Sequence, residues 1–148
     1  MKFDLNDTQF EKLLRLAYLG MWVAEAHDEG QESYFKEIEQ LLFEKAAESN
    51  LKEYVKHDKS SDKYFPSSVF DKDEVVSKAI DEYEEHCFWD ELIDRLAKVD
   101  IIDKYGMDTI QKMSFMERLD KEKEHMKIYE KEFSENGLDN LTVDVERP

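Results

Sequence analysis

Residues 76–99, VSKAIDEYEEHCFWDELIDRLAKV, decide how this chain folds, because two apolar stripes follow each other on one uninterrupted segment. At about 100° per residue, the centres of the two stripes lie on roughly opposite sides of one helical cylinder. The change of side falls between Cys87 and Phe88. The chain therefore either kinks there or forms a straight helix that different neighbours bury on different faces. The first stripe comprises Val76, Ile80, Tyr83 and Cys87, and the second comprises Phe88, Trp89, Leu92, Ile93, Leu96 and Val99.

The straight helix is the better interpretation, because sharp kinks usually have a cause such as glycine or proline, and neither lies between Asp71 and Gly106. Acidic residues at 71–74 favour a helix start, where the helix dipole stabilises negative charge. We expect this long third helix to lie across a small bundle or to run from the core of one subunit into a subunit interface.

Three other helices are predicted from apolar spacing and cap residues. The first begins at a capping box, Thr8–Glu11, and its apolar residues on nearly all sides predict the most buried element. Gly20 in its middle predicts the close approach of another helix. The second spans about residues 31–49. The fourth begins at the capping box Ser114–Glu117 and ends at Asn136–Gly137.

The two ends of the chain alternate apolar and polar residues with the period of a β-strand. We therefore expect residues 1–5 and 141–145 to pair as a small two-stranded β-ribbon, and residues 57–70 to form an irregular loop. The sequence thus predicts a mainly α fold, in which residues 1–148 form a single-domain bundle of about four long helices with a β-ribbon formed by the termini. The alternating apolar residues are Met1, Phe3 and Leu5 at the start and Leu141, Val143 and Val145 at the end.

The charge of the chain argues against several classes of partner. The formal net charge is −16, and residues 79–94 hold seven acids and no lysine or arginine. Such a field repels phosphate backbones and anionic lipid, so we expect neither direct nucleic-acid binding nor membrane binding. The uncharged run Leu16–Ala24 is too short to span a bilayer. A single cysteine cannot form an internal disulfide, which favours a cytoplasmic location.

The adjacent His86 and Cys87 suggest a catalytic pair, but their spacing opposes it. Neighbouring residues on a helix point about 100° apart, and the surrounding carboxylates disfavour a thiolate. We expect no catalytic residues, and the sequence leans towards a non-enzymatic protein.

A metal site built from carboxylates and histidines is the alternative function. Glu82 and His86 are spaced to share a helix face, and Glu122-x-x-His125 has the spacing found in di-iron helical bundles. Asp28 continues the apolar stripe of the first helix. Such bundles need two Glu-x-x-His motifs, and only one is present. A divalent metal or di-iron centre therefore stays an alternative to the view that no cofactor binds.

The leading hypothesis is an acidic, non-catalytic protein-interaction module. An acidic surface with exposed aromatic rings can steer and hold a basic protein partner, and an apolar face left over by the long helix could instead serve a homodimer. We expect the module to self-associate. The predicted contact residues are Asp81, Glu84, Glu85, Phe88, Trp89 and Asp90.

Two segments, LRLAYLGMWVAEAHDE at residues 14–29 and FWDELIDRLAKVD at residues 88–100, resemble a family of small bacterial proteins, some labelled "plasmid-related protein". The resemblance extends over most of the chain. It implies a bacterial, cytoplasmic origin and no established activity, and no catalytic residue follows from it.

Overall fold

The computed structural model describes residues 4–27 and 34–143, and the chain groups into two compact units, residues 1–82 and 83–148. Within the described residues the fold is mainly helical, as predicted, but it has five α-helices where about four were expected. The single-domain organisation stays a prediction, and each unit is described by itself. The main elements are α1 (Asp7–Glu25), α2 (Lys36–Ala47), β1 (Val55–Asp58), β2 (Lys63–Pro66), α3 (Glu74–Tyr105), α4 (Met107–Lys112) and α5 (Phe115–Asn136), with short 3-10 helices η1 (Lys52–Tyr54) and η2 (Phe70–Lys72).

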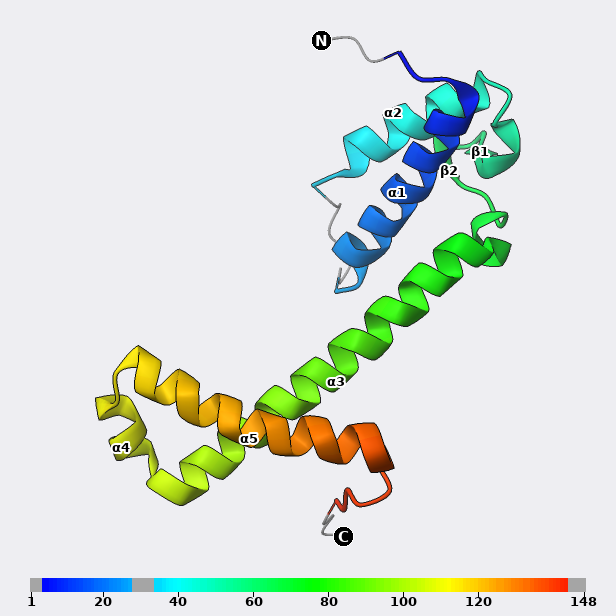
Figure 1. Ribbon diagram of the computed structural model, residues 1–148. Coiled ribbons are helices and arrows are strands. Elements are labelled where there is room, and N and C mark those ends of the chain that lie inside the picture. Colours follow the sequence, from blue (N-terminus) through cyan, green and yellow to red (C-terminus); the bar gives the residue numbers. More distant parts are fainter. Residues whose placement is uncertain (1–3, 28–33, 144–148) are drawn as a thin grey trace, which may run out of the picture. The chain divides into compact units, whose positions relative to one another are not determined.

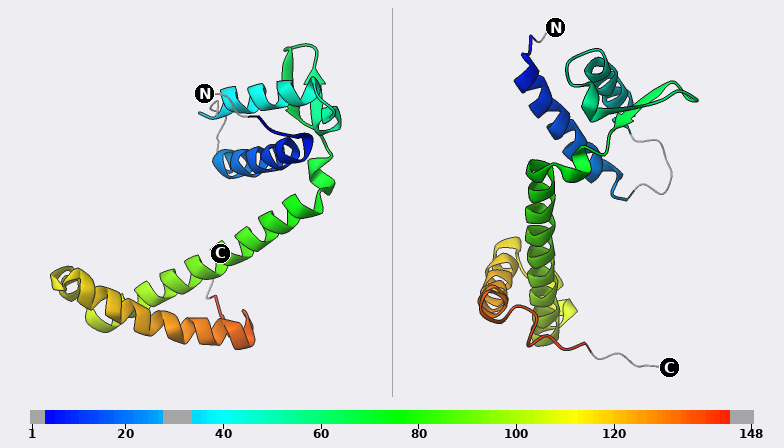
Figure 2. Two further views of the ribbon diagram at one scale, coloured as in Figure 1. Left: turned by 45° about the horizontal axis from the view of Figure 1, so that its top comes forward. Right: turned by 90° about the vertical axis from the view of Figure 1, so that its right-hand side faces the viewer.

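In the first unit, α1 and α2 pack side by side and the β-hairpin packs against α2 (Figures 1 and 2). Phe70 lies at the centre of the core. Its ring stacks on Tyr18 with centroids 4.5 Å apart and meets the edge of Phe43 at 6.0 Å. The core of this unit comprises Leu14, Phe43, Ala46, Leu51, Tyr54, Phe70 and Val76.

The only sheet of the described residues lies in mid-chain, so the predicted terminal ribbon is wrong. Strands β1 and β2 pair antiparallel, with Val55 opposite Pro66, inside the segment predicted as an irregular loop. Leu5 and residues 141–143 belong to no strand, and residues 1–3 and 144–145 lie outside the described residues. A tertiary contact favours the hairpin, because the Gln40 amide of α2 bonds both the N–H and the C=O of Tyr64.

Side chains within the hairpin loop form the hydrogen bonds that stabilise its turn. The Asp58 carboxylate accepts hydrogen bonds from the Ser60 amide and from the hydroxyls of Ser60 and Ser61. These bonds lower the pKa of Asp58 to about 2. Asp62 adopts a left-handed φ of 51°, which aspartate tolerates better than most residues. These local hydrogen bonds thus close a turn in a segment that was predicted, from its polar composition, to be an irregular loop.

Helix α1 is less buried than its composition predicts. Of its side chains Leu14 and Met21 are buried, whereas Leu16 is 65% exposed. A Cβ placed on Gly20 would meet nothing within 4 Å among the described residues, so these residues do not show the predicted close approach of another helix. The cap also differs, because the Asn6 side chain accepts from the Gln9 amide in place of a box starting at Thr8. Within the described residues of the first unit, neighbours cover one side of α1, and Leu16 and Val23 remain at the surface.

Helix α3 runs unbroken from Glu74 to Tyr105, which confirms the uninterrupted third helix. Val76 from its first stripe is buried in the first unit, and Ile80 packs on the same core. Ile93 and Ile101 from the second half are buried in the second unit. Different neighbours therefore bury the two ends of this helix. They do not bury opposite faces, because Val76 and Ile101 lie about 20° apart around the helix axis at 100° per residue. Phe88 and Val99 of the second stripe are about half exposed.

In the second unit, α5 runs back beside the last part of α3, and the short α4 joins the two helices at one end (Figure 1). Trp89 contacts Phe133, and the Tyr129 hydroxyl donates to Asp100 at 2.8 Å, so the two helices are antiparallel. The predicted limits of α5 are confirmed. Ser114 forms the capping box with Glu117, and Gly137 ends the helix with a φ of 55°.

Candidate interaction surfaces

The six predicted contact residues all lie on α3, and we call them the acidic face. Asp81, Glu84, Glu85 and Phe88 are spaced i, i+3, i+4 and i+7, so they share one side of the helix. Phe88 is 47% exposed there. Asp90 lies on another side and pairs with His86, whose Nε2 is 3.4 Å from Asp90 Oδ2. Trp89 is bonded to Glu85 and contacts Phe88, so the structure brings five of the predicted residues together and leaves Asp90 apart from them.

Most carboxylates of this side are not neutralised. Asp81 and Glu84 are exposed and have no ion-pair or hydrogen-bond partner among the described residues. Glu85 accepts a hydrogen bond from the Trp89 indole at 2.5 Å, which leaves its charge in place. A partner that contacts this side would meet free negative charge around an exposed aromatic ring.

Trp89 is half-buried and borders a hollow between α3 and α5. Its ring lies 5.4 Å from that of Phe133 and 4.9 Å, edge to face, from that of Phe88. The hollow has a volume of about 260 Å³, and we call it the Trp89 hollow. It is lined by Trp89 and Ile93 from α3 and by Glu130, Phe133 and Ser134 from α5.

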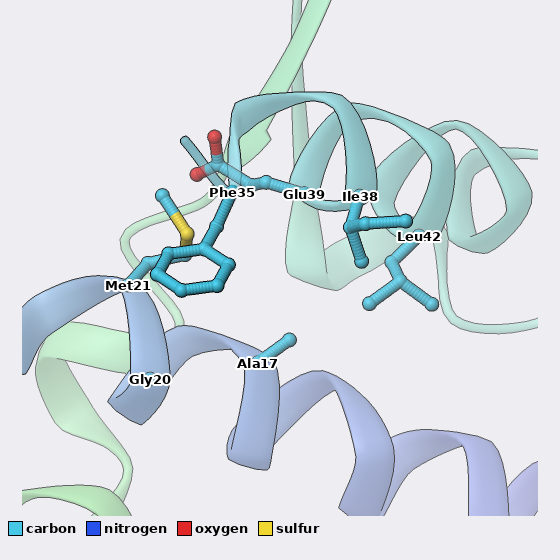
Figure 3. A pocket seen from close by; sticks show the side chains of 7 residues that line it. All are labelled: Ala17, Gly20, Met21, Phe35, Ile38, Glu39 and Leu42. Atoms are coloured by element: carbon cyan, nitrogen blue, oxygen red, sulfur yellow. The ribbon is translucent and has the colours of Figure 1, made fainter. Parts of the chain in front are cut away.

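A second hollow, which sequence patterns did not predict, lies between α1 and α2 in the first unit. Figure 3 shows Ala17 of α1 facing Ile38 and Leu42 of α2 across this α1–α2 groove. Its volume is about 210 Å³. The apolar residues around nearly all of α1 were a signal for such a surface, but they were interpreted as complete burial. The groove is lined by Ala17, Gly20, Met21, Phe35, Ile38, Glu39 and Leu42.

The one carboxylate in the groove lining is already neutralised. Glu39 is 4% exposed, and its carboxylate contacts the Lys36 ammonium. Burial alone would lower the pKa of Lys36, but the carboxylates of Glu39 and Glu25 outweigh burial and raise that pKa. The Lys36 ammonium also lies 5.5 Å from the centre of the Phe65 ring. The groove is therefore apolar without a free charge in its lining.

The candidate metal ligands do not form a site in the described residues. Glu82 and His86 are exposed on α3, and Asp28 lies outside the described residues. Glu122 lies 3.6 Å from Arg118, and His125 Nδ1 lies 3.5 Å from Asp100 Oδ2. Nowhere in residues 4–27 and 34–143 do three His, Cys, Asp or Glu side chains gather as metal ligands would.

The contacts of His125 were missed by sequence reasoning. His125 and Tyr129 are one turn apart on α5, and both face the same Asp100 oxygen. Burial first, and then the hydrogen bond to Asp100, raise the pKa of Tyr129 to about 12. A tyrosine four residues after the histidine was the available signal, but it does not reveal which acid of α3 the two meet.

Cys87 does not pair with its neighbour His86. Cys87 is half-buried, and a hydrogen bond with the thiol raises the pKa of the Tyr83 hydroxyl. The imidazole of His86 contacts Asp90 instead. The two residues therefore have different partners on different sides of the helix.

Comparison with known proteins finds no family model, no curated protein and no solved structure that matches this chain. The resemblance to the plasmid-related family stays a prediction. Among the helices of the described residues, none combines the length and apolar character needed to cross a membrane. The geometry of the two hollows and of the acidic face is the basis for interpreting function.

Proposed function

We propose that this protein is a non-catalytic, acidic interaction module that binds a basic protein partner through the acidic face of α3. The observation that carries this proposal is the exposure of Phe88 beside carboxylates that have no partner. Water solvates the carboxylates well but gains nothing from the ring. A basic partner would cover the ring and pair with the charges together.

The two kinds of residue contribute different parts of binding. Covering the exposed 47% of Phe88 removes on the order of 90 Å² of apolar surface from water, or about 2 kcal/mol. Carboxylates at the rim of an interface add little net affinity in high dielectric, but they accelerate the encounter with a positive partner. The module should therefore bind with a salt-sensitive association rate and a dissociation rate that depends on the aromatic contact.

Charge reversal tests this proposal. The test variant changes Asp81, Glu84 and Glu85 to lysine, and the control variant changes three exposed acids elsewhere, Asp103, Asp120 and Glu124. Each reversal adds two positive charges, so both variants have the same net charge.

The readout is the anisotropy of a fluorescent peptide of alternating lysine and alanine, measured at several salt concentrations, with circular dichroism as a check of folding. We expect the test variant to lose at least tenfold in affinity and the control variant to lose less than threefold. Equal losses would show that only net charge matters and would overturn the assigned face.

Self-association is the second part of the proposal, and the α1–α2 groove supports it. Leu16, Ile38 and Leu41 on its two helices are about half exposed or more. Because the groove lining holds no unpaired charge, a second copy can cover it without burying a free carboxylate. Light scattering at tens of micromolar should give a dimer mass, and Ile38→Glu should give a monomer with unchanged helicity. A monomer in the unaltered protein would contradict this part.

A further inference from the structure

The Trp89 hollow combines aromatic walls with a free acid. The Trp89 and Phe133 rings meet at 40°, and Ile93 is buried beside them. Glu130 also lines the hollow, and it has no ion-pair or hydrogen-bond partner among the described residues. An apolar recess with one unpaired carboxylate therefore lies next to the acidic face.

The chemistry of this lining selects the kind of occupant. A purely apolar group would take water from the Glu130 carboxylate without replacing its hydrogen bonds, which is costly. An anion would be repelled by the same carboxylate. A group with an apolar stem and a cationic head satisfies both parts, because the stem covers the rings while the head pairs with the acid. Lysine and arginine side chains have this form.

The tryptophan favours arginine over lysine. A planar guanidinium can stack on an indole face and at the same time donate two parallel hydrogen bonds to one carboxylate. The indole N–H of Trp89 is already bonded to Glu85, which holds the ring in place where it lines the hollow. The ring is therefore positioned before a ligand arrives, which lowers the entropy cost of binding.

We infer that the Trp89 hollow is a specificity pocket that takes an arginine side chain of the basic partner. This inference rests on the proposed function, because the acidic face brings the partner to the helix. It goes further in assigning recognition to one residue type and in adding Glu130 and Phe133 of α5 to the contact residues. Charge alone would not distinguish arginine from lysine at this position.

The experiment uses the full chain and three peptides of sequence Lys-Gly-X-Gly-Lys with blocked ends. X is arginine, lysine or citrulline, the last having the shape of arginine without its charge. Binding is followed by the NMR signals of the two indole N–H groups, assigned with a Trp22→Phe variant. Trp22 lies in the other unit and serves as an internal reference.

We expect the arginine peptide to shift the Trp89 indole signal and to bind at least fivefold more tightly than the lysine peptide. Citrulline should bind more weakly than both. Glu130→Gln should reduce the preference for arginine to less than twofold, whereas Glu135→Gln, an exposed acid further along α5, should leave it unchanged. Glu130 is exposed, so the substitution leaves the fold intact.

The outcomes separate this inference from the proposed function. Equal affinity for the arginine and lysine peptides, or an unmoved Trp89 signal, would overturn the arginine pocket. The acidic face would still stand in that case if reversal of its charges weakens both peptides. If that reversal weakens neither peptide, the proposed function fails, and the inference that rests on it fails as well.

Discussion

Asp73 offers the sharpest test of how the first unit is held together, because one carboxylate makes two kinds of bond. Its side chain is 7% exposed, and Oδ2 accepts from Arg15 Nε of α1 at 2.7 Å. Oδ1 accepts from the amides of Val75 and Val76 at 3.0 and 3.2 Å, which caps the start of α3. The residue thus joins α1 to the first turn of α3.

Two substitutions separate the two roles. Asp73→Asn keeps an oxygen for the cap and loses the charged bond to Arg15, which costs about 1.5–3 kcal/mol for a charge-assisted hydrogen bond. Arg15 retains Glu11 at 2.7 Å, so we expect a value near the lower end, about 2 kcal/mol. Asp73→Ala loses the cap as well, which adds about 1 kcal/mol. The expected order of stability is unaltered protein, Asp73→Asn, Asp73→Ala.

Urea unfolding followed by Trp22 fluorescence measures these values. A Trp89→Phe background makes Trp22 the sole tryptophan, and it lies in the same unit as Asp73. Asp71→Asn is the control, since Asp71 is an exposed acid two residues away. If Asp73→Asn were as stable as Asp71→Asn, the ion pair would contribute nothing. If Asp73→Ala equalled Asp73→Asn, the cap would contribute nothing.

The same carboxylate predicts a loss of stability in acid. Burial would raise the pKa of Asp73, but the bonds from Arg15 and the cap amides outweigh burial and lower it. Hydrogen bonds from Tyr54 and Arg15 lower the pKa of Glu11. A lowered pKa contributes stability that is present above the unfolded value, about 4, and is lost as pH falls through the folded value. The urea concentration at the midpoint of unfolding should decrease as the pH is lowered below about 4. This decrease should be smaller in Asp73→Asn.

Three further predictions concern the core, the second unit and metal content. Phe70→Ala should lower the free energy of unfolding by about 3–5 kcal/mol, because Phe70 is 1% exposed at the centre of the aromatic core. Urea unfolding measures this loss, and a loss below about 1 kcal/mol would reject the central role of Phe70. The pKa of Tyr129 is raised to about 12, so stability present below the unfolded pKa of about 10 should decline as pH rises towards 12. Trp89 fluorescence in urea should show this decline, and Tyr129→Phe should lack it. Protein purified without chelator should contain less than about a tenth of an equivalent of metal by elemental analysis, whereas stoichiometric iron, manganese or zinc would revive the metal-site alternative.

The candidate surface could be predicted in part. Spacing and charge predicted the acidic residues and Phe88 as contact residues. Phe88 is 47% exposed, and its role in a contact stays a prediction. The hollow beside it needs Phe133 and Glu130, which come from α5, and no pattern within α3 indicates them. The α1–α2 groove was missed because a sequence shows that a helix is apolar but not how many neighbours cover it.

The sequence by itself determined what depends on bonds between near neighbours. Helix α3 follows from the spacing of its residues, which permits an unbroken helix. The start of α5 follows from the hydrogen bonds between Ser114 and Glu117, three residues apart, and its end follows from the positive φ that Gly137 adopts. Tertiary structure decided the rest. The hairpin packs through Gln40 onto Tyr64, and the Trp89 hollow exists because Phe133 returns on a later helix. Such contacts join residues far apart in the chain, so their energy is set by which surfaces meet and not by any local pattern.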